Sequence, residues 1–177
     1  LRSEEKGEAV KEEAAAIAGF AKLRSFALEL LDLDGEHGDW FRSLPAGLKE
    51  VDIDCLWSLR NVSNISALAE CKELERLVLK CKELPDLKPL SKLEKLHELE
   101  IHSRQGLLNY QEVASLKTLP CLFVSSLFYG GNGLDSLVVP EGVVRLEVCA
   151  KFLTSVPNLW LRSCPNLETV VLRDCLL

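Results

Sequence analysis

One short hydrophobic pattern recurs along the chain. It can be written L-x-x-L-x-L, with apolar residues at its first, fourth and sixth places. Nine copies begin at Leu23, Leu48, Leu74, Leu96, Leu119, Leu134, Val143, Val156 and Leu167. Alternation of apolar and other residues over the second half of each copy predicts a short strand with one buried face.

A second pattern connects these predicted strands. Segments 62–74, 84–96 and 107–119 match one another at their apolar positions and follow at intervals of 22 and 23 residues. A spacing of three to four residues between apolar positions predicts a helical or 3₁₀ turn. One strand with one return segment cannot bury its own apolar side. We therefore predict stacked repeats that share a continuous core beneath a parallel sheet.

The two ends of the chain depart from the regular pattern. We predict a single domain over residues 1–177, in which 1–22 form a helix that caps the stack or belongs to the first repeat, and 23–124 form regular repeats. Residues 125–177 are expected to form irregular or shortened repeats, because the last four copies each start only 15, 9, 13 and 11 residues after the copy before them. A complete coil needs about 20 residues. Two explanations of these short intervals are open. Either residues are missing from the sequence, which we favour, or this part of the chain forms strand pairs, such as a hairpin through Val139–Val143, instead of coils.

The segment Leu84-Pro-Asp86-Leu87-Lys-Pro89-Leu90-Ser-Lys-Leu93 resembles the I-x-D-I-x-P-L-x-x-L segment of the leucine-rich-repeat family. The central repeats resemble the 22-residue class of internalins and of a Ser/Thr phosphatase regulatory subunit. The C-terminal segments around Cys164 and Cys175 resemble cysteine-containing repeats of F-box substrate receptors and plant immune receptors. The resemblance covers roughly residues 17–177. It implies an α/β solenoid with a curved parallel sheet on its concave face and helical or 3₁₀ segments on its convex face.

Composition and charge exclude several classes of protein. Leu accounts for 36 of the 177 residues and hydrophobic residues for 47%, which excludes intrinsic disorder. Residues 1–54 carry 13 acids and 7 bases, so the net charge of −6 belongs to this part of the chain. The Lys/Arg-rich stripe of a nucleic-acid-binding protein and the basic amphipathic helix of a membrane-surface protein are both missing. We predict neither a nucleic-acid nor a membrane partner.

Cysteine usage favours a reducing compartment. None of the seven cysteines has the C-x-x-C spacing of a zinc or redox site. Most lie within the Leu-rich pattern, where a thiol behaves as a small hydrophobic group. We predict an intracellular, cytoplasmic protein, although the glycosylation sequons at Asn61 and Asn64 favour the opposite.

Candidate chemistry is sparse. The acidic segment 32–39 resembles part of a calcium loop, but Ser43 stands where the bidentate Glu would be. His97 and His102 lack the partners of a zinc set, and the glycines of 130–133 lack the Lys-Ser/Thr of a phosphate loop. We therefore expect no metal, no cofactor and no catalytic residues, and a protein that is not an enzyme.

The predicted sheet offers a binding surface instead. Within each strand the residues between the buried apolar positions point to the concave face. Acids gather at its N-terminal end and arginines at its C-terminal end, and such a gradient can orient a partner. We expect Phe123, Trp160 and Arg162 to anchor a partner, and Asp52, Asp54 and Glu100 to orient it. The complete candidate set is Asp52, Asp54, Val78, Lys80, Glu100, His102, Phe123, Trp160, Arg162 and Arg173.

These features predict a non-catalytic protein–protein interaction module, acting as a scaffold, an adaptor or a substrate receptor. Two alternatives are open. One is the ligand-sensing repeat region of a larger receptor of the immune or F-box type. The other is a structural subunit of a large assembly, which would use two faces rather than one.

Overall fold

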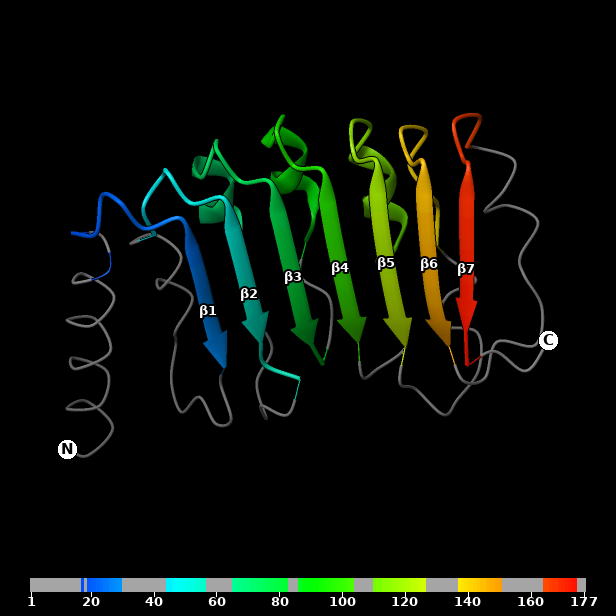
Figure 1. Cartoon of the computed structure of the whole chain (residues 1–177), viewed down its shortest axis with the longest axis horizontal. Coiled ribbons are helices and arrows are strands. Elements are labelled where there is room, and N and C mark those ends of the chain that lie inside the picture. Colours follow the sequence, from blue (N-terminus) through cyan, green and yellow to red (C-terminus); the bar gives the residue numbers. More distant parts are fainter. Residues whose placement is uncertain are drawn as a thin grey trace.

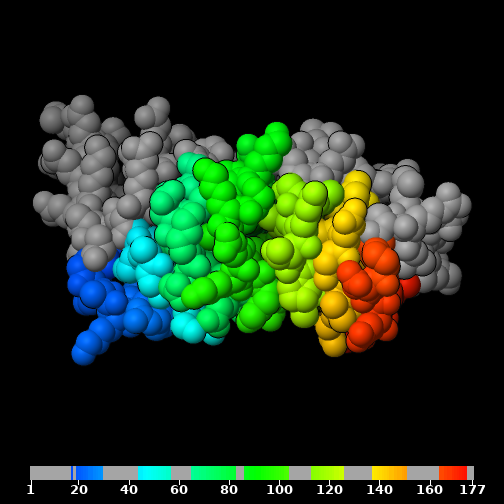
Figure 2. Space-filling model, turned by 90° about the horizontal axis from the view of Figure 1, so that it is seen from above, coloured from blue at the N-terminus to red at the C-terminus, as the bar shows by residue number. Residues whose placement is uncertain are grey.

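The computed structural model describes residues 17, 19–29, 44–56, 65–82, 86–103, 110–126, 137–150 and 164–174. Within these ranges, seven parallel strands form one sheet, and their order in space follows their order in the chain (Figure 1). Seen from above, the coils succeed one another along the long axis of the molecule (Figure 2). The strands are β1 (Ser25–Glu29), β2 (Glu50–Asp54), β3 (Arg76–Cys81), β4 (Glu98–Ser103), β5 (Cys121–Ser126), β6 (Arg145–Ala150) and β7 (Thr169–Arg173).

Alternating burial explains why these segments are strands. In β4, Leu99 and Ile101 are fully buried, whereas the residues that alternate with them are half-buried on the opposite side of the sheet. The strands pair in register, so that Leu99 lies beside Leu77 on one neighbour and Leu122 on the other. Each repeat thus adds its leucines to one continuous core, as the sequence pattern predicts.

Short 3₁₀-helices cover one side of the sheet (Figure 1). They are η2 (Ser66–Glu70), η3 (Lys88–Lys92) and η4 (Tyr110–Ser115), and they direct Leu68, Leu90 and Val113 into the core. The Asp86 carboxylate accepts a hydrogen bond of 2.9 Å from the Lys88 N–H just before η3. The acidic residue of the repeat therefore partners backbone at the turn, as the side chain of an Asp commonly does.

The same turn hydrogen bonds occur in the first repeat. The Leu93 and Leu96 N–H groups donate to the carbonyls of residues 90 and 93, at 3.0 and 3.3 Å. Phe20 and Leu23 donate equivalently to residues 17 and 20, at 3.0 and 2.9 Å. Ile17, Phe20 and Leu23 thus have the spacing and the turn hydrogen bonds of Leu90, Leu93 and Leu96. The remainder of the predicted N-terminal helix lies outside the described residues.

The C-terminal strand assignments require a correction. Leu137 and Val139 are buried but belong to the segment before β6 rather than to a strand. Leu137 precedes Val143 by six residues, as Leu90 precedes Leu96. The copy that begins at Leu134 was therefore wrongly assigned, because apolar residues of a return segment can satisfy the same spacing.

The strands that do form are regularly spaced. Leu119, Val143 and Leu167, which begin the patterns of β5, β6 and β7, are 24 residues apart, enough for a complete coil. The hairpin through Val139–Val143 is also wrong, since β6 pairs parallel to β5. The copy at Val156 lies outside the described residues, and β7 follows β6 directly in the sheet.

Close stacking of the coils constrains one glycine. A Cβ atom on Gly142 would lie 2.2 Å from the Lys117 carbonyl oxygen of the preceding coil. Neighbouring coils are also joined by backbone: the Pro120 carbonyl accepts from the N–H groups of Val144 and Arg145, at 2.8 and 3.0 Å. No helix among the described residues is long and apolar enough to cross a membrane.

Candidate functional site

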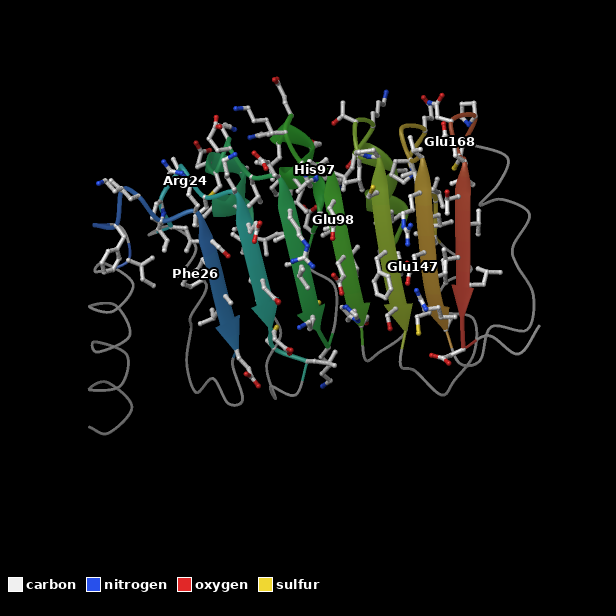
Figure 3. The ribbon with its side chains drawn as sticks, viewed as in Figure 1. Arg24, Phe26, His97, Glu98, Glu147 and Glu168 are labelled. Atoms are coloured by element: carbon white, nitrogen blue, oxygen red, sulfur yellow. The ribbon has the colours of Figure 1, made fainter. Side chains whose placement is uncertain are left out.

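The side of the sheet opposite the 3₁₀-helices carries the candidate binding surface, which we call the open face. Each strand contributes three side chains to it, and Figure 3 shows Glu98 and Glu147 on the two strands that flank β5. From β1 to β7 these triplets are Ser25, Ala27 and Glu29; Glu50, Asp52 and Asp54; Arg76, Val78 and Lys80; Glu98, Glu100 and His102; Cys121, Phe123 and Ser125; Arg145, Glu147 and Cys149; and Thr169, Val171 and Arg173.

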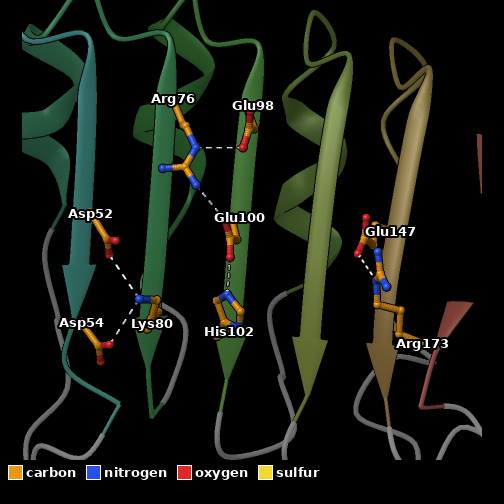
Figure 4. Close-up of polar contacts among 9 residues, drawn as sticks. All are labelled: Asp52, Asp54, Arg76, Lys80, Glu98, Glu100, His102, Glu147 and Arg173. Atoms are coloured by element: carbon orange, nitrogen blue, oxygen red, sulfur yellow. Dashed lines mark hydrogen bonds and ion pairs between the residues drawn. The ribbon is translucent and has the colours of Figure 1, made fainter. Parts of the chain in front are cut away.

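Ion pairs across strands hold the side chains of β2, β3 and β4 (Figure 4). The Lys80 ammonium lies 3.7 Å from Asp52 and 3.3 Å from Asp54 on β2. On the other side, Arg76 Nε donates to Glu98 at 2.8 Å, and its Nη2 donates to Glu100 at 3.0 Å. The hydrogen bond that Arg76 donates to Glu98 raises the pKa of Arg76 above its ordinary value. Opposite charges in register across strands stabilise both strands.

Glu100 connects this network to β5. Its other carboxylate oxygen lies 2.6 Å from His102 Nε2. The His102 ring in turn contacts Phe123, with ring centroids 5.1 Å apart and planes tilted by 43°. The position of Phe123 is therefore coupled to the ion pairs of β3 and β4.

A second cluster of charges joins β6 and β7. Glu147 accepts hydrogen bonds from Arg173 Nε at 2.5 Å and from Arg145 Nη2 at 3.0 Å. The Glu147 side chain is only 14% exposed, whereas those of Arg145 and Arg173 are 52% and 59% exposed. These two guanidinium groups, Arg173 foremost, hold the pKa of Glu147 below its ordinary value.

Strand β5 separates the two charged regions and carries no charge on the open face. Its side chains there are Cys121, Phe123 and Ser125. Because these are uncharged and Cys121 is small, a hollow of about 280 Å³ opens between β4 and β6. We call it the Phe123 hollow; its lining residues are Glu98, Glu100, Cys121, Leu122, Phe123, Arg145 and Glu147.

Net charge changes along the open face. Strands β1 to β4 contribute six acids and two bases, namely Glu29, Glu50, Asp52, Asp54, Glu98 and Glu100 against Arg76 and Lys80. Strands β5 to β7 contribute one acid and two bases, namely Glu147 against Arg145 and Arg173. The acidic-to-basic gradient expected from the sequence is therefore present, although most of its charges are paired.

The structure brings most of the candidate residues together. Seven of them lie on the open face with exposed or half-buried side chains: Asp52, Asp54, Lys80, Glu100, His102, Phe123 and Arg173. Within the Asp52 side chain, the Oδ1 atom is buried. Val78 is only 1% exposed and is not a surface residue. Trp160 and Arg162 lie outside the described residues.

The open face can be divided into columns that take one side chain from each strand. The copies of the pattern at Leu134 and Val156 predict Val138 and Trp160 in the middle column and Pro140 and Arg162 in the next. The register instead pairs Phe123 with Glu147 and Glu147 with Val171. Val138 and Pro140 precede β6 rather than forming part of a strand.

Sequence reasoning missed a third column of the open face. Arg76, Glu98 and Arg145 each stand directly before the second apolar residue of their repeat, and all three make ion pairs. The signal was available in the same strand periodicity, because this position alternates with the buried leucines.

Within the described ranges, His, Cys, Asp and Glu form no group of three that could hold a metal ion. The six cysteines in these ranges are thiols. Burial raises the pKa of the Cys71 thiol, and burial together with the nearby Cys55 raises that of Cys81. These thiols therefore serve as packing groups, since the reactive form of cysteine is the thiolate.

Comparison with known proteins agrees with this architecture. No family model and no curated protein match the chain. The solved structure of an internalin (inlF) from Listeria monocytogenes matches 91% of this chain with a TM-score of 0.58 and 20% identity. The chain spans 44% of the length of that internalin. An internalin C2 (inlC2) from the same species matches 92% of this chain and 75% of its own, with a TM-score of 0.44 and 21% identity. Together, the repeat pattern, the parallel sheet and the first of these matches show that the chain has the leucine-rich-repeat fold.

Proposed function

We propose that the protein is a non-catalytic interaction module that binds a protein partner on the open face. The observation that carries this proposal is the position of Phe123. It is a half-buried aromatic residue in the uncharged strand β5, with charged strands on both sides. Aromatic residues, Phe among them, are enriched in protein interfaces, where a few anchor residues carry most of the binding energy.

The charged residues have a different part in this proposal. Asp52, Asp54 and Glu100 are held by Lys80, Arg76 and His102, so their positions are fixed before a partner arrives. The acidic strands at one end and Arg173 at the other favour one orientation of a charged partner. Trp160 and Arg162 remain predicted anchors.

A ligand-sensing function has less support. The Phe123 hollow measures about 280 Å³, which is below the range of about 300 to 1,000 Å³ in which small-molecule pockets commonly fall. A protein surface therefore fits the open face better than a small molecule does.

The test starts from a partner captured with the wild-type protein, identified by mass spectrometry and purified. Titration calorimetry then compares the wild type with Phe123→Ala. We expect the substitution to weaken binding by about tenfold or more, as removal of an aromatic anchor does. Lys92→Ala is the matched control, because Lys92 is exposed on η3 on the other side of the sheet.

The control variant should bind as the wild type does. Both variants are first checked by thermal unfolding, so that a loss of affinity is not mistaken for a loss of fold. Equal affinities of Phe123→Ala and wild type would rule out the open face at β5 as the binding surface.

A further inference from the structure

We propose that the Phe123 hollow is a subsite for one arginine side chain of the protein partner. The proposal rests on the proposed function and specifies the chemistry of the contact. It comes from three observations: the dimensions of the hollow, the charges of its walls and the aromatic ring within it.

The hollow has the dimensions of one long side chain. Its walls stand on β4 and β6, which are separated by β5 and are therefore about 10 Å apart at the backbone. Glu98 and Glu100 project from one wall and Glu147 from the other, while Cys121 and Leu122 line the space between them. A volume of about 280 Å³ is enough for a single long side chain.

The β4 wall can receive one cation. Three carboxylates and one guanidinium line the hollow, and each carboxylate already accepts a hydrogen bond from an arginine of this chain: Glu98 and Glu100 from Arg76, and Glu147 from Arg145 and Arg173. The Oε1 atom of Glu98 accepts a hydrogen bond from Arg76. The Oε2 atom of Glu98 accepts no hydrogen bond from the described residues. Arg145 binds Glu147 and has a side chain that is 52% exposed, so it occupies the β6 side of the opening. An incoming cation would therefore bind on the β4 side, where Glu98 Oε2 is available.

Phe123 favours arginine among the cations. Its ring contacts His102, which fixes the ring, and the residue remains half-buried rather than covered. A guanidinium group is planar, stacks on an aromatic face and can donate to a carboxylate at the same time. Lysine supplies a charge without this planar contact. The site therefore pairs a stacking surface with one acceptor at its edge.

The test uses N-acetyl-arginine N-methylamide as the probe. Amide chemical shifts of Cys121, Phe123 and Glu147 are followed by NMR during titration of the full chain. We expect saturable shifts at these three amides. The citrulline analogue, which has the same shape without the charge, should produce none that saturate.

Substitutions then locate the probe. Phe123→Leu and Glu98→Gln should each weaken probe binding by about fivefold, through loss of the stacking contact or of the acceptor charge. Glu29→Gln is the matched control, because it removes the same charge from β1, outside the hollow. Each variant is used only after its amide spectrum shows the native fold.

Equal binding of the citrulline analogue, or unchanged binding by Phe123→Leu and Glu98→Gln, would overturn the proposal. If the arginine probe fails while Phe123→Ala still weakens the captured partner, the arginine subsite is wrong and the proposed function stands. If Phe123→Ala leaves partner affinity unchanged, the proposed function fails, whatever the probe does.

Discussion

Strands β2 to β4 and strands β5 to β7 share one core and one register but differ on the open face. In the first region, Arg76 and Lys80 on β3 are each paired with acids on neighbouring strands. In the second region, β5 contributes no charge, and the charges gather around Glu147. The first region uses its polar side chains to hold itself together. The second leaves an aromatic ring available to another molecule, in a hollow that it shares with β4.

This difference separates stability from recognition in a repeat protein. The buried leucines recur in every coil, because each coil must cover its neighbours. The residues that alternate with them are constrained by no such requirement and can differ from strand to strand. Binding specificity is therefore expected where the alternating residues break their own pattern, as they do at β5.

The largest expected effect tests whether the two regions share an equivalent core. Leu99 in β4 and Leu146 in β6 are both 0% exposed. Replacement of either by Ala should lower the free energy of unfolding by about 2 to 5 kcal/mol, because it removes buried contacts and leaves a cavity. Urea denaturation measures the loss. A small loss at Leu146 beside a large loss at Leu99 would show that the two regions do not form one equivalent core.

The next effect compares coil stacking at the two ends. A Cβ on Gly142 would meet a backbone oxygen at 2.2 Å, whereas a Cβ on Gly47 would meet the flexible Arg24 side chain at 2.9 Å. We expect Gly142→Ala to destabilise the protein by about 1 to 3 kcal/mol. Gly47→Ala should cost less than about 0.5 kcal/mol, because the arginine can move aside. Thermal unfolding of the two variants provides the measurement, and equal melting temperatures would contradict this account of stacking.

The smallest effect concerns the charges of the second region. Arg173 and Arg145 lower the pKa of Glu147 in the folded protein, so ionised Glu147 stabilises the fold at neutral pH. This contribution is lost as the pH falls from the ordinary value of 4.5 through the lower folded pKa. The stability difference between wild type and Glu147→Gln should therefore shrink as the pH falls below about 4.5.

Denaturation curves at a series of pH values measure this difference. Glu98→Gln is the comparison in the first region, because the Glu98 side chain is more exposed, at 41%, and its ion pair should contribute less. A difference for Glu147→Gln that stays constant between neutral and acidic pH would show that its two arginines do not stabilise the fold.

The apolar periodicity of the sequence predicted the fold, because the buried positions recur in every coil. Leu77, Leu99 and Leu122 lie at equivalent places of their repeats and are neighbours in the sheet. The pattern failed at Leu137 and Val139, because apolar residues of a return segment can satisfy the spacing that marks the start of a strand. Spacing alone could not tell a strand from the turn before it.

The candidate site was predicted less completely than the fold. Periodicity placed Phe123, Glu100, Asp52 and Val78 on one face. It could not show that the Val78 side chain is buried there. The ion pairs of Arg76 and Glu147 depend on which strands are neighbours, and misassigned strands change those neighbours. Only the register of β5, β6 and β7 shows that Glu147 lies between Phe123 and Val171.

The most direct test of the open face as the binding surface is an amide chemical-shift map of the protein with its captured partner. The account predicts that the largest shifts fall on β4, β5 and β6, around Cys121, Phe123 and Glu147, with small shifts in η2, η3 and η4. Shifts concentrated in the 3₁₀-helices, with β5 unchanged, would contradict it.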